Sequence, residues 1–69
     1  MRLSTRNQLP GTVTSVVEGQ VTAIVKVALD GGQSVTSSIT LEAAKDLGLA
    51  VGTAVIVLVK ASEVTLAVE

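Results

Sequence analysis

The amino-acid sequence predicts an all-β fold, a small antiparallel barrel of five short strands accompanied by a single helix. The β-branched residues are unusually frequent, with 13 Val, 3 Ile and 8 Thr among 69 residues, and residues of this kind are enriched in strands. The apolar runs are short and are separated by turn residues, and one segment alone has the composition of a helix. A chain of this length forms one domain, so we treat residues 1–69 as a single unit.

Three strands are expected in the first part of the chain. Gly11 to Val17 is the first, and Glu18-Gly19-Gln20 forms the turn that follows it. Val21 to Leu29 alternates with a period of two, which predicts a half-buried strand. Asp30-Gly31-Gly32 supplies a tight hairpin turn, and Gln33 to Ile39 runs back as a Ser- and Thr-rich third strand.

A helix and two strands are expected in the remainder. Thr40 is a suitable N-cap for a helix over Leu41 to Leu47, and Gly48 is placed to end it. Thr53 to Lys60 is the fourth predicted strand and Val64 to Val68 the fifth. This order matches the OB-type five-stranded Greek-key barrel with one helix between the third and fourth strands.

The fourth strand indicates self-association. In Val55 to Val59 every residue is apolar, so both faces of this strand require burial. One face can pack inside the barrel, but the other needs a partner. A chain without Cys, His or aromatic residues also lacks the disulfides, metal sites and large side chains that usually stabilise a domain this small. We therefore expect a homo-oligomer.

The composition excludes several classes of function. Without Cys or His there is no thiol or imidazole chemistry, and the six acidic residues fall singly, so we expect no enzyme and no cofactor. Glu42 and Asp46 share a helical face beside Lys45, which is more typical of a solvated surface than of a catalytic pair. Five basic residues and a net charge of −1 provide no basic field for nucleic acid.

No membrane attachment is expected either. The apolar stretch Ala54 to Val59 is too short to cross a bilayer. The first eleven residues, MRLSTRNQLPG, lack the apolar core of a signal peptide. The sequence therefore predicts a cytoplasmic protein.

Two polar segments carry hydrogen-bond donors. Ser4-Thr5-Arg6-Asn7-Gln8 precedes the first predicted strand, and Lys60-Ala61-Ser62 lies between the last two. Cationic and neutral donors beside the free N–H groups of strand ends are suited to an oxyanion. Taken singly, the same residues have ordinary explanations: Arg6 and Lys60 as solvated charges, and Asn7 and Ser62 as turn formers.

These residues also carry a family resemblance. Ser4 to Gly11, reading STRNQLPG, resembles the S-x-R-N-x-L-x-G opening of the molbindins, small bacterial proteins of the Mop or TOBE type that bind molybdate and tungstate. Further matches follow in register over Val21 to Val25, Asp46 to Leu49 with Val51-Gly52, and Val59 to Val64, reading VTAIV, DLGL with VG, and VKASEV.

The resemblance implies an OB-type fold assembled as a hexamer, a trimer of dimers, with oxyanions held at subunit interfaces and no direct metal ligand. One type of oxyanion site would use Ser4, Thr5, Arg6, Asn7, Lys60, Ala61 and Ser62. A second type, near the threefold axis, would use Gly19, Gln20, Val21, Thr22 and Ala23.

The expected function is binding and storage or buffering of molybdate and tungstate in the cytoplasm, with no nucleic-acid or membrane partner. One alternative is an OB module that binds nucleic acid or oligosaccharide, although OB recognition of bases depends on aromatic stacking and a basic groove. Another is a purely structural oligomerisation module in which Ser4 to Asn7 only caps the barrel. Stabilisation by the ligand would distinguish this last alternative from oxyanion binding.

Overall fold

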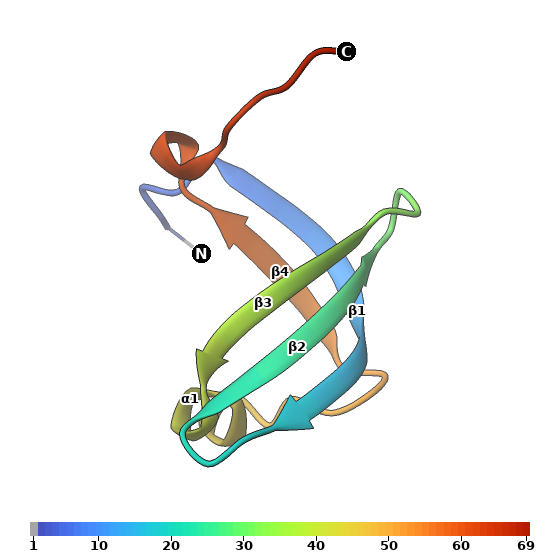
Figure 1. Ribbon diagram of the computed structural model, residues 1–69, viewed down its shortest axis with the longest axis vertical. Helices are drawn as coiled ribbons and strands as arrows, with labels where there is room; N and C mark the ends of the chain where they lie inside the picture. The colour runs from blue at the N-terminus through green and yellow to red at the C-terminus, as the bar shows by residue number, and fades with distance from the viewer. Residues whose placement is uncertain (1) are drawn as a thin grey trace.

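The computed structural model describes residues 2–69, which form one curled antiparallel sheet and a short helix (Figure 1). The sheet order is β3-β2-β1-β4. The elements in chain order are β1 (Asn7–Glu18), β2 (Thr22–Leu29), β3 (Ser34–Thr40), α1 (Leu41–Asp46), β4 (Ala54–Val59) and a 3-10 turn, η1 (Ala61–Glu63). The predicted all-β OB-type architecture is confirmed, with four strands in the sheet instead of five.

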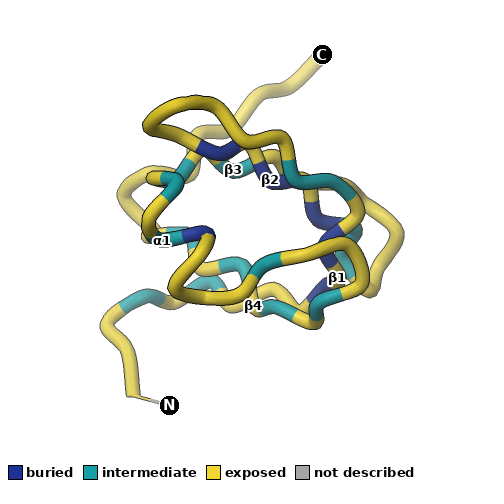
Figure 2. Tube along the Cα trace, turned by 90° about the horizontal axis from the view of Figure 1, so that it is seen from below, coloured by how far each residue is buried: buried dark blue, intermediate teal, exposed yellow. Residues whose placement is uncertain are grey.

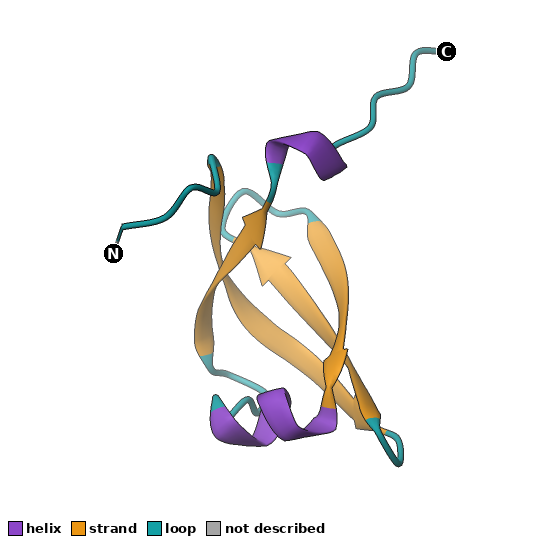
Figure 3. Cartoon of the chain, turned by 90° about the vertical axis from the view of Figure 1, so that its left-hand side faces the viewer, coloured by secondary structure: helices purple, strands orange, loops and turns teal. Residues whose placement is uncertain are grey.

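The long strand β1 bends the sheet because it pairs with different neighbours along its length. Residues 7–12 pair with β4, and residues 11–18 pair with β2. The register with β2 shifts between Val13 and Ser15, leaving Thr14 as the extra residue of a β-bulge. A bulge bends its strand and increases the local twist, and here it allows the strands to curl around a shared interior (Figure 3).

The core is small and consists of valine and alanine. Val13, Val25 and Val27 form its buried cluster, and Ala23 and Ala44 are also buried. The buried positions lie on β1, β2 and α1 (Figure 2). The alternation predicted for β2 is therefore confirmed, except that Val21 lies in the preceding turn and is 73% exposed.

The helix begins and ends where the sequence predicts to within one residue. Thr40 is its N-cap, and its Oγ1 accepts a hydrogen bond of 3.0 Å from the Ala43 N–H. Gly48 follows the helix with φ of 63°, the left-handed conformation that glycine adopts most readily. In the β2–β3 hairpin only Gly32 of the two glycines has a positive φ.

The predicted fifth strand is absent from the sheet of the single chain, which is a correction to the expected count. Residues 64–69 leave the body of the molecule as an exposed tail (Figure 1), with Leu66 92% and Val68 98% exposed. A strand forms only where another strand offers free backbone groups, and the tail points away from its own sheet. Its strand-like sequence consequently has no partner within the chain.

Candidate oxyanion site

The two polar segments lie at the same end of the sheet because β1 and β4 are antiparallel neighbours. Asn7 opens β1 and is paired with Val59, the last residue of β4. Ser4 to Arg6 therefore precedes β1 at the point where Lys60 to Ser62 follows β4 (Figure 1). Segments more than 50 residues apart in sequence are in this way brought to one place.

Side-chain amides hold the first segment in position. The Asn7 Nδ2 donates to the Val59 carbonyl oxygen at 3.0 Å, which links the two segments directly. The Gln8 Nε2 donates to the Thr5 carbonyl oxygen at 3.4 Å, a longer contact within the first segment. Of these two bonds, the Asn7 bond is therefore the one that spans the site.

The second segment forms the turn η1, which exposes backbone donors. Glu63 N–H bonds to the Lys60 carbonyl oxygen at 2.9 Å, and Val64 N–H bonds to the Ala61 carbonyl oxygen at 3.3 Å. The N–H groups of Ala61 and Ser62 begin the turn, where a helical turn supplies no acceptor for them. The turn therefore offers two backbone donors in the same short segment that carries the Lys60 and Ser62 side chains.

The donor set suits an anion that only accepts hydrogen bonds. Residues 4–7 and 60–62 contribute two cations, three hydroxyls and one amide, with no carboxylate among them. Thr5 and Asn7 are half-buried, while the other residues of the set are exposed. Charge-assisted bonds from Arg and Lys are the strong ones in such a set. In a single chain, however, the site is an open surface.

The residues of the second predicted oxyanion site, 19–23, lie in different surroundings in the structure. Ala23 is fully buried in the core, and the Gly19 N–H closes the turn by bonding to the Thr22 carbonyl oxygen at 2.8 Å. Gln20 and Val21 instead line a shallow hollow together with the N-cap and residues of α1. The remaining residues of that hollow are Thr40, Leu41, Glu42, Lys45 and Asp46.

This hollow lies at the opposite end of the sheet from the first site (Figure 1). Glu42, Lys45 and Asp46 are exposed, as the sequence predicts, and the structure adds that they lie beside the turn that contains Gln20 and Val21. The link is a backbone bond of 2.8 Å from Leu41 N–H to the Val21 carbonyl oxygen. This bond continues the β2–β3 register beyond the Thr22–Thr40 pair, so the predicted hairpin already brings Val21 beside Leu41.

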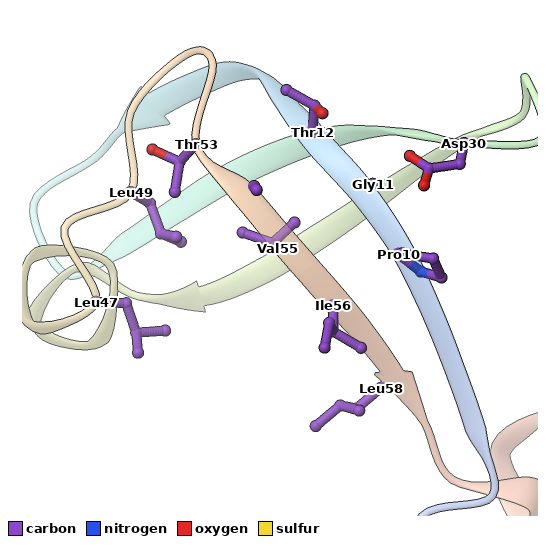
Figure 4. Close-up of a pocket in the computed structure, with 11 residues that line it drawn as sticks. Pro10, Gly11, Thr12, Asp30, Leu47, Leu49, Thr53, Val55, Ile56 and Leu58 are labelled. Carbon is purple, nitrogen blue, oxygen red and sulfur yellow. The ribbon is translucent and has the colours of Figure 1, made fainter. Parts of the chain in front are cut away.

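An apolar groove runs along β4 (Figure 4). Ile56 and Leu58 on its floor are 50% and 43% exposed, as expected for a strand with two apolar faces. Leu47 and Leu49 border the groove on one side, and Pro10 and Asp30 on the other. The groove therefore presents hydrocarbon to solvent in the single chain.

Two further findings concern residues 2–69 only. Within that range, no three carboxylates cluster closely enough to hold a metal ion. No helix in the same range has both the length and the apolar character needed to span a membrane.

Comparison with known proteins gives a consistent result. Residues 3–66 match the TOBE domain family. A "probable molybdenum-pterin-binding protein" of Haemophilus influenzae is 42% identical over 69 residues, covering the whole of both chains.

Two solved structures are similar in fold as well as in sequence. A molybdate-binding protein from Sporomusa ovata superposes with a TM-score of 0.92 at 36% identity, covering 97% of this chain and 98% of that one. The cytoplasmic molybdate-binding protein ModG, solved with molybdate bound, gives a TM-score of 0.88 at 46% identity, covering 91% of this chain and 45% of that one.

Proposed function

Because the chain belongs to the TOBE domain family, we propose that it binds molybdate and tungstate as oxyanions and serves to store or buffer them. The observation that carries the proposal is the convergence of Ser4 to Asn7 and Lys60 to Ser62 at one end of the β1–β4 pair. The relatives that match along the whole chain are named for binding molybdenum compounds or molybdate.

The site works by hydrogen bonding and charge alone. A tetrahedral dianion accepts bonds on all four oxygens, and this site offers the Arg6 guanidinium, the Lys60 ammonium, hydroxyls and free N–H groups. No bond to the metal atom is required. The protein is on this account a binding protein and not an enzyme, and it requires no cofactor.

The site is completed by a second copy of the chain. The donors of one chain lie on an open surface, where water competes for the anion. Two apolar features support assembly: the groove along β4 and the exposed tail at residues 64–69. We infer a homo-oligomer, a hexamer built as a trimer of dimers, in which neighbouring chains cover the anion. A cytoplasmic location agrees with the description of ModG.

Calorimetric titration with four oxyanions tests the proposal. Molybdate and tungstate are expected to bind, and sulfate, a smaller dianion, is expected to bind more weakly. Phosphate carries at least one proton near neutral pH, and that proton needs an acceptor. The site offers mainly donors, so phosphate leaves its own O–H or a protein N–H unpaired at a cost of about 1–3 kcal/mol, and we expect it to be rejected.

Two results would contradict this account. Phosphate that displaced molybdate as readily as sulfate does would show that an acceptor such as Glu63, the neighbour of Ser62, turns into the site. Absence of molybdate binding at any protein concentration would leave a structural oligomerisation module as the function. Thermal unfolding with and without molybdate provides an independent check, because a ligand that binds only the folded protein raises Tm.

A further inference from the structure

Asn7 occupies a special place in the proposed oxyanion site because it connects the two segments that form it. It is the first residue of β1, and its Cα is paired with that of Val59, the last residue of β4. Its side chain is half-buried, unlike those of its neighbours Arg6 and Gln8. Its Nδ2 donates to the Val59 carbonyl oxygen at 3.0 Å.

This bond reinforces the terminal residue pair of the β1–β4 ladder, Asn7 with Val59, at the point where both segments leave the sheet. In the described part of the chain, the hydrogen bonds beyond Val59 stay inside the turn, joining Glu63 to Lys60 and Val64 to Ala61. Residues 60–69 are all exposed. The position of Lys60 and Ser62 relative to Arg6 therefore depends on how firmly the ends of β1 and β4 are joined.

The chemistry of the Asn7 amide also favours a structural task over anion contact. Its Nδ2 donates one of its two hydrogens to the Val59 carbonyl oxygen, and its Oδ1 can only accept hydrogen bonds. An oxyanion such as molybdate accepts as well, so Oδ1 offers it nothing. The guanidinium, ammonium, hydroxyl and backbone donors on either side of Asn7 are better suited to the anion.

We propose that Asn7 is a positioning residue of the oxyanion site, which fastens Val59 so that the segments 4–6 and 60–62 keep the spacing that binds the anion. This inference rests on the proposed function and deepens it, because it assigns Asn7 to the support of the site and not to its ligand set. Preorganised donors bind more tightly because less conformational entropy is lost on binding.

An engineered disulfide between positions 7 and 59, which can be formed or reduced, tests this role. Asn7→Ala should weaken molybdate binding by about tenfold, since a hydrogen bond that orders the site is lost. In the double variant Asn7→Cys with Val59→Cys, directly opposed strand residues can form a disulfide, because their Cα atoms lie about 4.5–5.5 Å apart in an antiparallel pair. The natural chain has no cysteine, so this disulfide forms without competition.

Oxidised and reduced forms of the same double variant then give the decisive comparison by titration with sodium molybdate. If Asn7 acts by positioning, the oxidised form binds within about threefold of the wild type, and the reduced form binds as weakly as Asn7→Ala. If the amide contacts the anion, the disulfide restores nothing. A verified disulfide with the weak affinity of Asn7→Ala would therefore overturn the proposal, as would wild-type affinity in Asn7→Ala itself.

Hydrogen exchange in the absence of molybdate gives a second readout that does not require the double variant to fold. Loss of the bond from Asn7 to Val59 should accelerate exchange of the Glu63 amide hydrogen in Asn7→Ala. If Asn7 only contacts the anion, the exchange rates of the ligand-free protein should not change. Gln8→Ala is the matched control, because it removes a neighbouring exposed amide whose 3.4 Å bond stays within the first segment. Unaltered exchange in Asn7→Ala would count against positioning. Wild-type protein that fails to bind molybdate would refute the proposed function separately.

Discussion

Gly11 shows how a single residue permits the close approach of β1 and β2. A Cβ at this position would lie 2.6 Å from the Ala28 carbonyl oxygen and 2.7 Å from the Val27 Cγ1. The carbonyl belongs to the backbone and cannot move aside without disturbing the sheet. We expect Gly11→Ala to lower the free energy of unfolding by about 1–3 kcal/mol, the usual cost of overpacking, as measured by urea denaturation.

Gly31→Ala is the matched control for this substitution. The Cβ added at Gly31 would meet the Gln33 Oε1 at 3.1 Å, and this atom is the end of a flexible side chain in the exposed hairpin. The two variants should therefore differ clearly in stability. Equal urea midpoints would show that the backbone at Gly11 adjusts more easily than the structure indicates.

Arg6 and Lys60 carry the positive charge of the proposed site. Both are exposed, so their removal should leave the fold and the assembly intact. A hydrogen bond to a charged group contributes about 1.5–3 kcal/mol, so Arg6→Ala and Lys60→Ala should each weaken molybdate binding roughly ten- to hundredfold. Lys26→Ala, which removes an exposed cation from the middle of β2, is the control for net charge. Calorimetric curves that match the wild type for both site variants would return Arg6 and Lys60 to the role of solvated charges.

The helix α1 depends on its cap, because six residues form few internal hydrogen bonds. Thr40 supplies the cap through the 3.0 Å bond from Ala43 N–H to its Oγ1. We expect Thr40→Ala to lower the free energy of unfolding by about 1 kcal/mol, within a range of roughly 0.5–2 kcal/mol. Thr40→Ser retains the hydroxyl and should recover most of the loss in the same denaturation experiment. Equal losses in both variants would indicate that the methyl group, and not the cap, is responsible.

The strand β2 and the helix α1 are predicted correctly from signals that lie close along the chain. The period-two pattern of β2 is informative because β2 pairs with both adjacent strands, β1 and β3. The helix is signalled locally by Thr40 and Gly48. In contrast, the apolar pattern of residues 64–68 indicates a strand but not which chain supplies its neighbour. That is why the predicted fifth strand is missing from the single chain.

The same distinction applies to the proposed sites. Ser4 to Asn7 and Lys60 to Ser62 stand out by residue type, and their meeting follows from the antiparallel pairing of β1 and β4. The family resemblance implies a single site over residues 19–23. A turn places consecutive residues in different surroundings, so Ala23 is buried while Gln20 lines a hollow. The contribution of α1 to that hollow follows from the β2–β3 register, which pairs Thr22 with Thr40 and so brings Val21 beside Leu41.

At the scale of the whole molecule, the core of the single chain is too small to bury all of its apolar side chains. The buried hydrophobic residues are small: Val13, Ala23, Val25, Val27 and Ala44. The larger side chains of Ile56, Leu58 and Leu66 are 43% to 92% exposed, and they lie on β4 and on the C-terminal tail. Apolar surface of this kind usually marks a contact with another protein. A second copy of this chain offers an apolar surface of the same kind in return.

Leu66 provides the most direct test of assembly, because a monomer and an oligomer predict opposite results. In a single chain Leu66 is 92% exposed, so Leu66→Asp would leave a monomer unaffected. If the tail pairs with another copy, a buried charge without a partner opposes assembly, and light scattering should show a smaller particle at micromolar concentration.

Thr65→Asp is the matched control for Leu66→Asp, because successive residues of a strand face opposite sides. It adds the same charge to the side of the tail that would face solvent, and it should preserve the assembly. The wild-type Tm should also rise with protein concentration, since folding is then linked to association. The Tm of Leu66→Asp should lose that dependence. A wild-type particle with the mass of one chain, or a Leu66→Asp particle equal in mass to the wild type, would show that the tail and its apolar face serve no contact between copies.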